Sequence, residues 1–161
     1  MKLNLTNLIL NKPIIKEEDI SFENENLSSF MLKKINNCHV KIEATLYQDL
    51  LRIKFDIYAL ATGICAYTLE DVPLPVKIHD ELSFTNDEKD TSSILIEENI
   101  IDIDYYTLSL ILSYIPKKII KEGAKLPPSG DGYRVLKEED LEEEREKNKT
   151  SPFDVLDNLE L

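Results

Sequence analysis

An alternation of apolar and polar residues, which changes phase once between positions 40 and 57, constrains this fold more than any other feature. From Val40 to Tyr47 the apolar residues stand at even positions, and from Leu51 to Ile57 they stand at odd positions. A β-strand turns successive side chains to opposite faces, so each stretch predicts a half-buried strand. A tight turn at 48–49 would reverse the chain and account for the change of phase. The sequence therefore predicts a β-hairpin whose second strand faces solvent with Arg52, Lys54 and Asp56.

Other segments predict further strands with less regular patterns. We expect strands from the N-terminus to about Leu10, from Val76 to Phe84 and at 93–97, because these stretches alternate or are rich in apolar residues. Prolines just before the second of these are tolerated at strand starts and sheet edges. The polar, acidic segment 16–29 predicts a connecting loop, followed by a short helical turn at 30–35.

The clearest helix signal lies at Asp104–Ile115. Asp104 is a suitable N-cap, and Pro116 predicts the end of the helix because the residue before a proline is pushed out of the helical region. Helical spacing places four apolar residues on one face: Leu108, Ile111, Leu112 and Ile115. We expect this face to pack on the sheet.

Together these elements predict an α+β protein with a mostly antiparallel, curved sheet, one main packed helix and an acidic, helical C-terminal tail. We expect a single domain at 1–136 and a tail at 137–161. The tail holds ten acidic and four basic residues, which is half of the net charge of −12. Ser151 and Pro152 are typical of a helix start and would open a short amphipathic turn at the end of the chain.

Charge and composition exclude several classes of function. The formal charge of −12 over 161 residues repels phosphate, which argues against binding of DNA or of nucleic acid without regard to sequence. The most apolar run, 108–115, is well short of the roughly 20 residues that span a bilayer, and the N-terminus lacks the pattern of a secretory signal. We therefore expect a cytoplasmic protein that does not bind membranes, with Cys38 and Cys65 as free thiols.

Candidate catalytic and metal-binding groups are few. The spacing of the two cysteines and two histidines matches no zinc pattern, so we expect no metal and no cofactor. Asp102 and Asp104, two apart ahead of a helix, suit either an acid–base or cation-binding pair, or ordinary contacts of carboxylates with a helix N-terminus. We expect no catalytic residues, and an RNA-processing or RNA-modifying enzyme that uses these two aspartates is the alternative.

Two charged segments suit contact with a partner. The acidic residues of 138–146 form either a solvated helix or a surface for a basic protein. Basic residues with a nearby aromatic ring form a possible contact for RNA or another partner, and otherwise an ordinary solvated surface: Lys117, Lys118, Lys121, Lys125, Tyr133 and Arg134.

Three segments also resemble one known family in their order and spacing. They are Cys65-Ala66-Tyr67-Thr68-Leu69-Glu70 followed by Val72 and Pro75-Val76, the stretch from Ile101-Asp102-Ile103-Asp104 to Ile115-Pro116, and Ser151-Pro152-Phe153-Asp154-Val155-Leu156-Asp157-Asn158-Leu159. Through them residues 40–161 resemble the YceD family, the large ribosomal RNA subunit accumulation proteins. The segment 121–135 is similar to the YlbN-like branch of Gram-positive relatives. The matching motif positions are Cys65, Leu69, Asp102, Asp104, Pro116, Gly130, Pro152, Phe153 and Leu156.

The resemblance implies a ribosome biogenesis factor that supports accumulation of large-subunit ribosomal RNA and assembly of that subunit. It implies no catalytic residues, and its expected partner is a basic large-subunit ribosomal protein or precursor ribosomal RNA. Tyr67 and Thr68 stand where the family has arginine and a second cysteine, so no thiol pair is expected at that turn. An acidic interaction module unrelated to ribosomes remains a further alternative.

Overall fold

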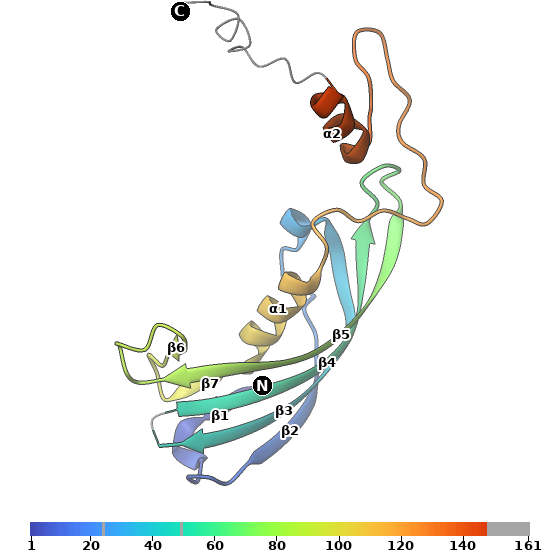
Figure 1. Cartoon of the computed structure of the whole chain (residues 1–161). Coiled ribbons are helices and arrows are strands. Elements are labelled where there is room, and N and C mark those ends of the chain that lie inside the picture. The colour runs from blue at the N-terminus through green and yellow to red at the C-terminus, as the bar shows by residue number, and fades with distance from the viewer. Residues whose placement is uncertain (24, 49, 148–161) are drawn as a thin grey trace, which may run out of the picture. The chain divides into compact units, whose positions relative to one another are not determined.

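The computed structural model describes residues 1–23, 25–48 and 50–147. Its contacts divide the chain into two compact units, Met1–Lys121 and a second that begins at Glu122. This division comes before the predicted boundary at 136. The predicted α+β class is confirmed, with a curved, mostly antiparallel sheet and one packed helix in the first unit (Figure 1).

The main sheet has five strands in the order β2-β3-β4-β5-β6. These strands are β2 (Ile14–Ile20), β3 (Leu32–Tyr47), β4 (Leu50–Ile64), β5 (Asp71–Thr85) and β6 (Ile94–Leu95). Neighbouring strands are antiparallel except β5 and β6, which pair in parallel at two residues. Along most of its length β5 is thus an edge strand, and Pro73 and Pro75 lie where a missing N–H breaks no ladder.

The predicted hairpin is confirmed and is longer than expected. Val40 pairs with Ile57 and Tyr47 with Leu50, so the chain reverses between Tyr47 and Leu50, and Gln48 has a positive φ of 48°. The alternating apolar residues of the predicted hairpin, such as Val40, Ile53 and Phe55, are buried on one face of the sheet. Arg52 and Lys54 are exposed on the other face. The change of phase therefore reports a real turn.

Strand β2 contradicts the predicted loop at 16–29. Its burial pattern shows exposed side chains at Ile15–Asp19, because the strand lies at the edge of the sheet and both of its faces are open. Pairing with β3, from Ile14 opposite Ala44 to Ile20 opposite Cys38, makes it a strand despite its polar sequence.

Two further N-terminal predictions need correction. The first strand, β1, is only Lys2–Asn4, and the chain then forms the 3-10 helix η1 (Leu5–Asn7). The helical turn predicted at 30–35 is the 3-10 helix η2 at Ser28–Phe30. The sequence from Leu32 onward already belongs to β3 because its apolar residues pair with the end of β4.

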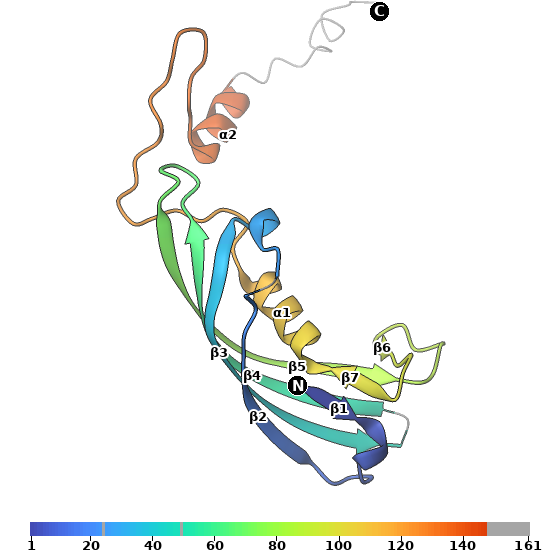
Figure 2. The same cartoon turned by 180° about the vertical axis from the view of Figure 1, so that it is seen from behind.

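Helix α1 (Ile103–Tyr114) lies against the hollow side of the curved sheet (Figure 2). It begins directly after β7 (Ile100–Asp102), which pairs with β1 in a separate two-stranded sheet. The core lies between α1 and the main sheet, and its fully buried side chains include Val40, Ile42, Ile53, Phe55, Ile57, Ile78, Ile103 and Ile111.

The buried face of α1 is rotated from the predicted face. Ile111 is buried as expected, but Leu108, Leu112 and Ile115 are only partly buried. The other helical residues that face the core are Ile103, Thr107 and Leu110. The helix carries apolar residues on several of its faces, so the sequence alone does not determine which face is buried.

The second unit contains helix α2 (Glu138–Lys147), which confirms the predicted acidic helix. The segment before it, from 122 to 137, has no helix or strand and contains one isolated β-bridge, between Gly130 and Tyr133.

Candidate functional site

The turn between β4 and β5 holds the first motif residues. Within Cys65–Glu70, the N–H of Cys65 donates to the carbonyl of Glu70 at 2.8 Å, and the N–H of Leu69 donates to the carbonyl of Cys65 at 2.9 Å. Leu69 closes the turn with a φ of 59° and is 72% exposed. The Leu69 side chain therefore contributes little to the packing of the core.

The segment that follows α1 attaches to the same turn. Ala66 donates its N–H to the carbonyl of Ile119 at 2.8 Å, and the N–H of Lys121 donates to the Sγ of Cys65 at 3.4 Å. The side chain of Ile119 is buried beside Gly63. The structure therefore brings motif residue Cys65 and the predicted contact residue Lys121 together, although they lie far apart in the sequence.

The two cysteines have opposite acidities. Cys65 is buried, yet its pKa is lowered to about 7, first by the backbone N–H of Lys121 and then by the hydroxyl of Thr68. Burial raises the pKa of Cys38 to about 11, with smaller contributions from Asp104 and Asp19, so Cys38 stays a neutral thiol at physiological pH.

Two of the predicted basic residues in the first unit already have partners inside the chain. The Nζ of Lys121 lies 2.9 Å from a carboxylate oxygen of Glu70, and this contact lowers the pKa of Glu70. The Nζ of Lys118 lies 5.0 Å from the centre of the Tyr67 ring. Lys117 is exposed beside the exposed Pro116.

The remaining predicted contact residues lie in the second unit, so the structure does not join them with the first group. Arg134 forms a two-pronged pair with Glu144, at 3.2 and 3.1 Å. Tyr133 is 61% exposed, and its ring covers Gly130 so closely that a Cβ at Gly130 would lie 2.5 Å from it. Lys125 is exposed.

Asp102 and Asp104 occupy different positions from those expected. Asp102, not Asp104, is the N-cap of α1, and its Oδ1 accepts the N–H of Asp104 at 3.1 Å. Asp104 forms an ion pair with the amino group of Met1, whose carbonyl accepts the N–H of Ile103 at 3.0 Å. Both carboxylates thus have local partners at the helix start. The motif residues Pro152, Phe153 and Leu156 lie outside the described residues.

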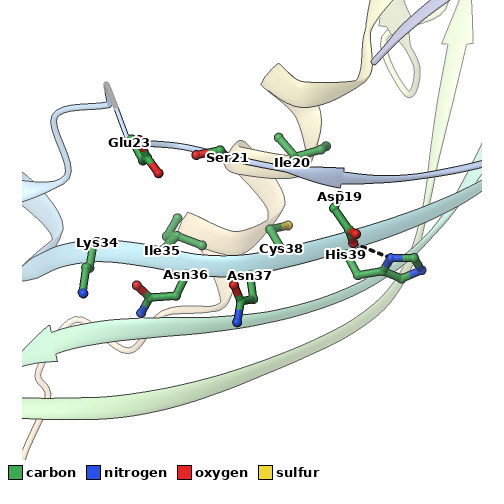
Figure 3. Close-up of a pocket in the computed structure, with 10 residues that line it drawn as sticks. All are labelled: Asp19, Ile20, Ser21, Glu23, Lys34, Ile35, Asn36, Asn37, Cys38 and His39. Carbon is green, nitrogen blue, oxygen red and sulfur yellow. Dashed lines mark hydrogen bonds and ion pairs between the residues drawn. The ribbon is translucent and has the colours of Figure 1, made fainter.

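A pocket of about 690 Å³ lies beside a bulge in β3, at a place that the sequence analysis missed (Figure 3). Asn36 pairs with Leu60 and His39 with Tyr58, so β3 has one more residue than β4 between these pairs. Asn37 has a φ of 42° at this point. Consequently the neighbouring side chains of Asn36 and Asn37 point to the same side of the strand, and Cys38 points to the other (Figure 3).

Two polar side chains that line this pocket, His39 and Asn36, have hydrogen-bond partners. His39 Nδ1 lies 2.8 Å from a carboxylate oxygen of Asp19, and Asn36 donates to the hydroxyl of Thr62 at 3.2 Å. Lys34 and Asn37 extend beside them (Figure 3). This arrangement suits a polar ligand. Asparagine adopts a positive φ more readily than most residues, but the local sequence does not place a bulge at Asn37, because the bulge depends on pairing with β4.

Comparison with known proteins adds no assignment, because the chain matches no family model, no curated protein and no solved structure. Within residues 1–23, 25–48 and 50–147, no helix is long and apolar enough to cross a membrane. The same ranges contain no group of three or more His, Cys, Asp or Glu residues that are placed to hold a metal ion.

Proposed function

We propose that this protein is a cytoplasmic, non-enzymatic biogenesis factor that binds a basic large-subunit ribosomal protein and thereby supports accumulation of large-subunit ribosomal RNA. The resemblance of residues 40–161 to the YceD family supports the ribosomal assignment. The distribution of paired and unpaired charge supports the choice of a basic protein as partner.

That distribution is the observation on which the proposal depends. Two of the five basic residues predicted for RNA contact are paired with carboxylates inside the chain, Lys121 with Glu70 and Arg134 with Glu144. The net charge of −12 therefore leaves a large excess of carboxylates over free cations. An excess of this sign attracts a basic protein and repels the phosphates of RNA.

In this proposal the acidic protein shields a basic ribosomal protein before assembly. Newly made basic ribosomal proteins bind RNA and other anions without selectivity, and a carboxylate-rich surface competes for the same cations. Ribosomal RNA, with its higher density of charge, then displaces the factor. Because the attraction is ionic, the complex weakens as salt shortens the Debye length, which is about 10 Å at 0.1 M.

A direct binding assay tests the proposal. The purified chain is titrated with purified basic large-subunit ribosomal proteins and, separately, with fragments of precursor large-subunit RNA, at low and moderate salt. We expect saturable binding of at least one ribosomal protein that weakens with salt, together with much weaker binding of RNA. Binding of RNA alone would contradict the choice of partner, and binding of neither would contradict the ribosomal assignment.

Direct RNA contact is a second candidate, which one observation favours. The Nζ of Lys118 lies 5.0 Å from the centre of the Tyr67 ring, and a lysine beside an aromatic ring suits contact with a phosphate and a stacked base. Reversal of charge in the variant Lys117→Glu/Lys118→Glu would abolish RNA binding in this case. The variant leaves the Lys121–Glu70 pair intact but removes the contact of Lys118 with Tyr67 in the turn, so circular dichroism first checks that it is folded.

A further inference from the structure

A second cavity, of about 340 Å³, lies next to the start of α1 and differs in chemistry from the pocket at the bulge. Its walls are the end of β5 at Phe84, the segment 94–98, and the first turn of α1 with Tyr105 and Tyr106. We call it the acidic–aromatic pocket. Its volume is near the lower end for ligand sites, which suits a single inserted side chain.

Carboxylates lie at the rim of this pocket. Glu97, Glu98 and Asp102 are all exposed, and its lining includes no Lys, Arg or His residue. Among the described residues, no ion pair joins Glu97 or Glu98 to a cation. The pocket therefore presents negative charge that the chain itself does not neutralise.

Backbone hydrogen bonds hold the two glutamates in place. On one side of them, Ile96 donates its N–H to the carbonyl of Thr85 at 2.8 Å, and on the other side the carbonyl of Asn99 accepts the N–H of Leu5 at 2.9 Å. A segment fixed at both ends loses little further freedom when a ligand binds. The carboxylates are thus presented by an ordered backbone.

Aromatic rings form one wall. The Tyr106 ring meets Phe84 edge to face at 5.0 Å and Tyr105 edge to face at 5.2 Å. Tyr105 is 65% exposed, so a ligand can reach its ring. The pKa of Tyr106 is raised by burial, by Tyr105 and by Glu97, which is consistent with a carboxylate close to the rings.

We propose that the acidic–aromatic pocket binds an arginine side chain that a basic protein segment inserts beside Tyr105, with Glu97 and Glu98 as its carboxylate partners. A guanidinium stacks on an aromatic face and pairs with carboxylates in two-pronged geometry, so it satisfies both walls at once. An anionic ligand would meet only repulsion here. This inference rests on the proposed function, because it names where the basic partner binds.

Fluorescence anisotropy with a short, labelled, arginine-rich peptide tests the pocket, and the same peptide with glutamine in place of arginine is the control ligand. In Glu97→Gln/Glu98→Gln we expect about a tenfold loss of affinity, since partly exposed ion pairs of this kind contribute up to about 1 kcal/mol each. The matched variant Glu17→Gln/Glu23→Gln removes the same charge from other exposed positions and should bind within about twofold of wild type. Equal losses in both pairs would overturn the pocket in favour of general charge attraction.

Two substitutions of Tyr105 distinguish the contribution of its ring to peptide binding from that of its hydroxyl group. Tyr105→Phe keeps the aromatic face and should bind the peptide as wild type does, whereas Tyr105→Ala should lose about threefold to tenfold. Equal binding by Tyr105→Ala and wild type would overturn the role of the ring. Because Tyr105 is exposed, circular dichroism should show both variants folded.

The same glutamate variants, tested on the basic ribosomal protein, distinguish the two proposals. If wild type binds that protein and Glu97→Gln/Glu98→Gln binds it equally well, the pocket assignment fails and the proposed function stands. If wild type binds the arginine peptide but no ribosomal protein, the proposed function fails and the pocket stands.

Discussion

The two units of this chain are stabilised in different ways. In the first unit, β3, β4, β5 and α1 contribute to one apolar core, with side chains such as Ile57 and Ile111 fully buried. In the second unit, no side chain that the structure describes between Glu122 and Glu146 is buried. What the structure shows there is a turn at Gly130–Tyr133, a charged pair and a solvated helix.

This difference separates stability from partner binding. Buried apolar surface is the main source of folding free energy. All the buried apolar residues that the structure describes lie in the first unit. Exposed charge contributes little to stability but much to the attraction of a partner. Substitutions in the two units should therefore have separable effects.

The largest expected effect tests burial in the two helices. Ile111→Asp places a charge in the core and should cost more than about 4 kcal/mol, a large part of the roughly 5–15 kcal/mol by which an ordinary domain is stable. Leu141→Asp makes the same kind of change in α2, where Leu141 is 39% exposed, and should leave the thermal unfolding of the sheet unchanged. Thermal melts followed by circular dichroism compare the two variants. A normal melting temperature for Ile111→Asp would contradict the packing of α1.

The predictability of the fold follows the same division between burial and exposure. The hairpin at 40–57 was predictable because one buried face imposes a strict alternation on the sequence. Strand β2 was not, because an edge strand with exposed Lys16, Glu17 and Glu18 has the composition of a loop. Only its pairing with β3 makes it a strand.

The start of α1 and the candidate sites could not be predicted from local sequence patterns. Asp102 and Asp104 are both good N-caps, and β7 decides between them because it continues to Asp102. The contact between Cys65 and Lys121 and the acidic–aromatic pocket join residues far apart in the sequence. The pattern of a single sequence contains no signal for such contacts. Glu97-Glu98 and Tyr105-Tyr106 can be read in the sequence, but only the structure shows that they line one pocket.

A smaller effect is expected from two glycines, one in each unit. A Cβ at Gly63 would lie 2.6 Å from Ile119 and 2.9 Å from Leu74, so Gly63→Ala overpacks the site and should cost about 1–3 kcal/mol. Gly123 has a φ of 75° but open space around it. Gly123→Ala should strain only the second unit and leave urea unfolding of the sheet unchanged. Equal losses of stability would show that the units unfold together.

Cysteine acidity gives opposite dependences of stability on pH. The lowered pKa of Cys65 favours the folded thiolate, so its contribution is present above the usual cysteine pKa of about 8.5 and is lost as the pH falls through about 7. The stability difference between wild type and Cys65→Ala should therefore be larger at about pH 9 than at about pH 6.

The contribution of Cys38 has the other sign. Its thiol stays neutral up to a pKa of about 11, so its contribution is present below about 8.5 and is lost as the pH rises from there toward 11. The difference between wild type and Cys38→Ala should shrink over that range in urea titrations. A growing difference would contradict the buried, neutral thiol.

The smallest effect is expected from the charged pair of the second unit. Arg134→Ala removes the contact with Glu144, and a surface pair of this kind contributes about 0–1 kcal/mol. We expect a slight loss of helical circular dichroism and no change in the melting of the sheet. A large drop in melting temperature would show that this pair supports the first unit.

The most direct test of the central claim is recovery of the tagged protein from growing cells at low and moderate salt, with and without ribonuclease, followed by identification of bound proteins and RNA. The account predicts a basic large-subunit ribosomal protein that remains bound after ribonuclease treatment and is released by salt. Recovery of precursor RNA that ribonuclease abolishes, with no ribosomal protein remaining, would contradict it.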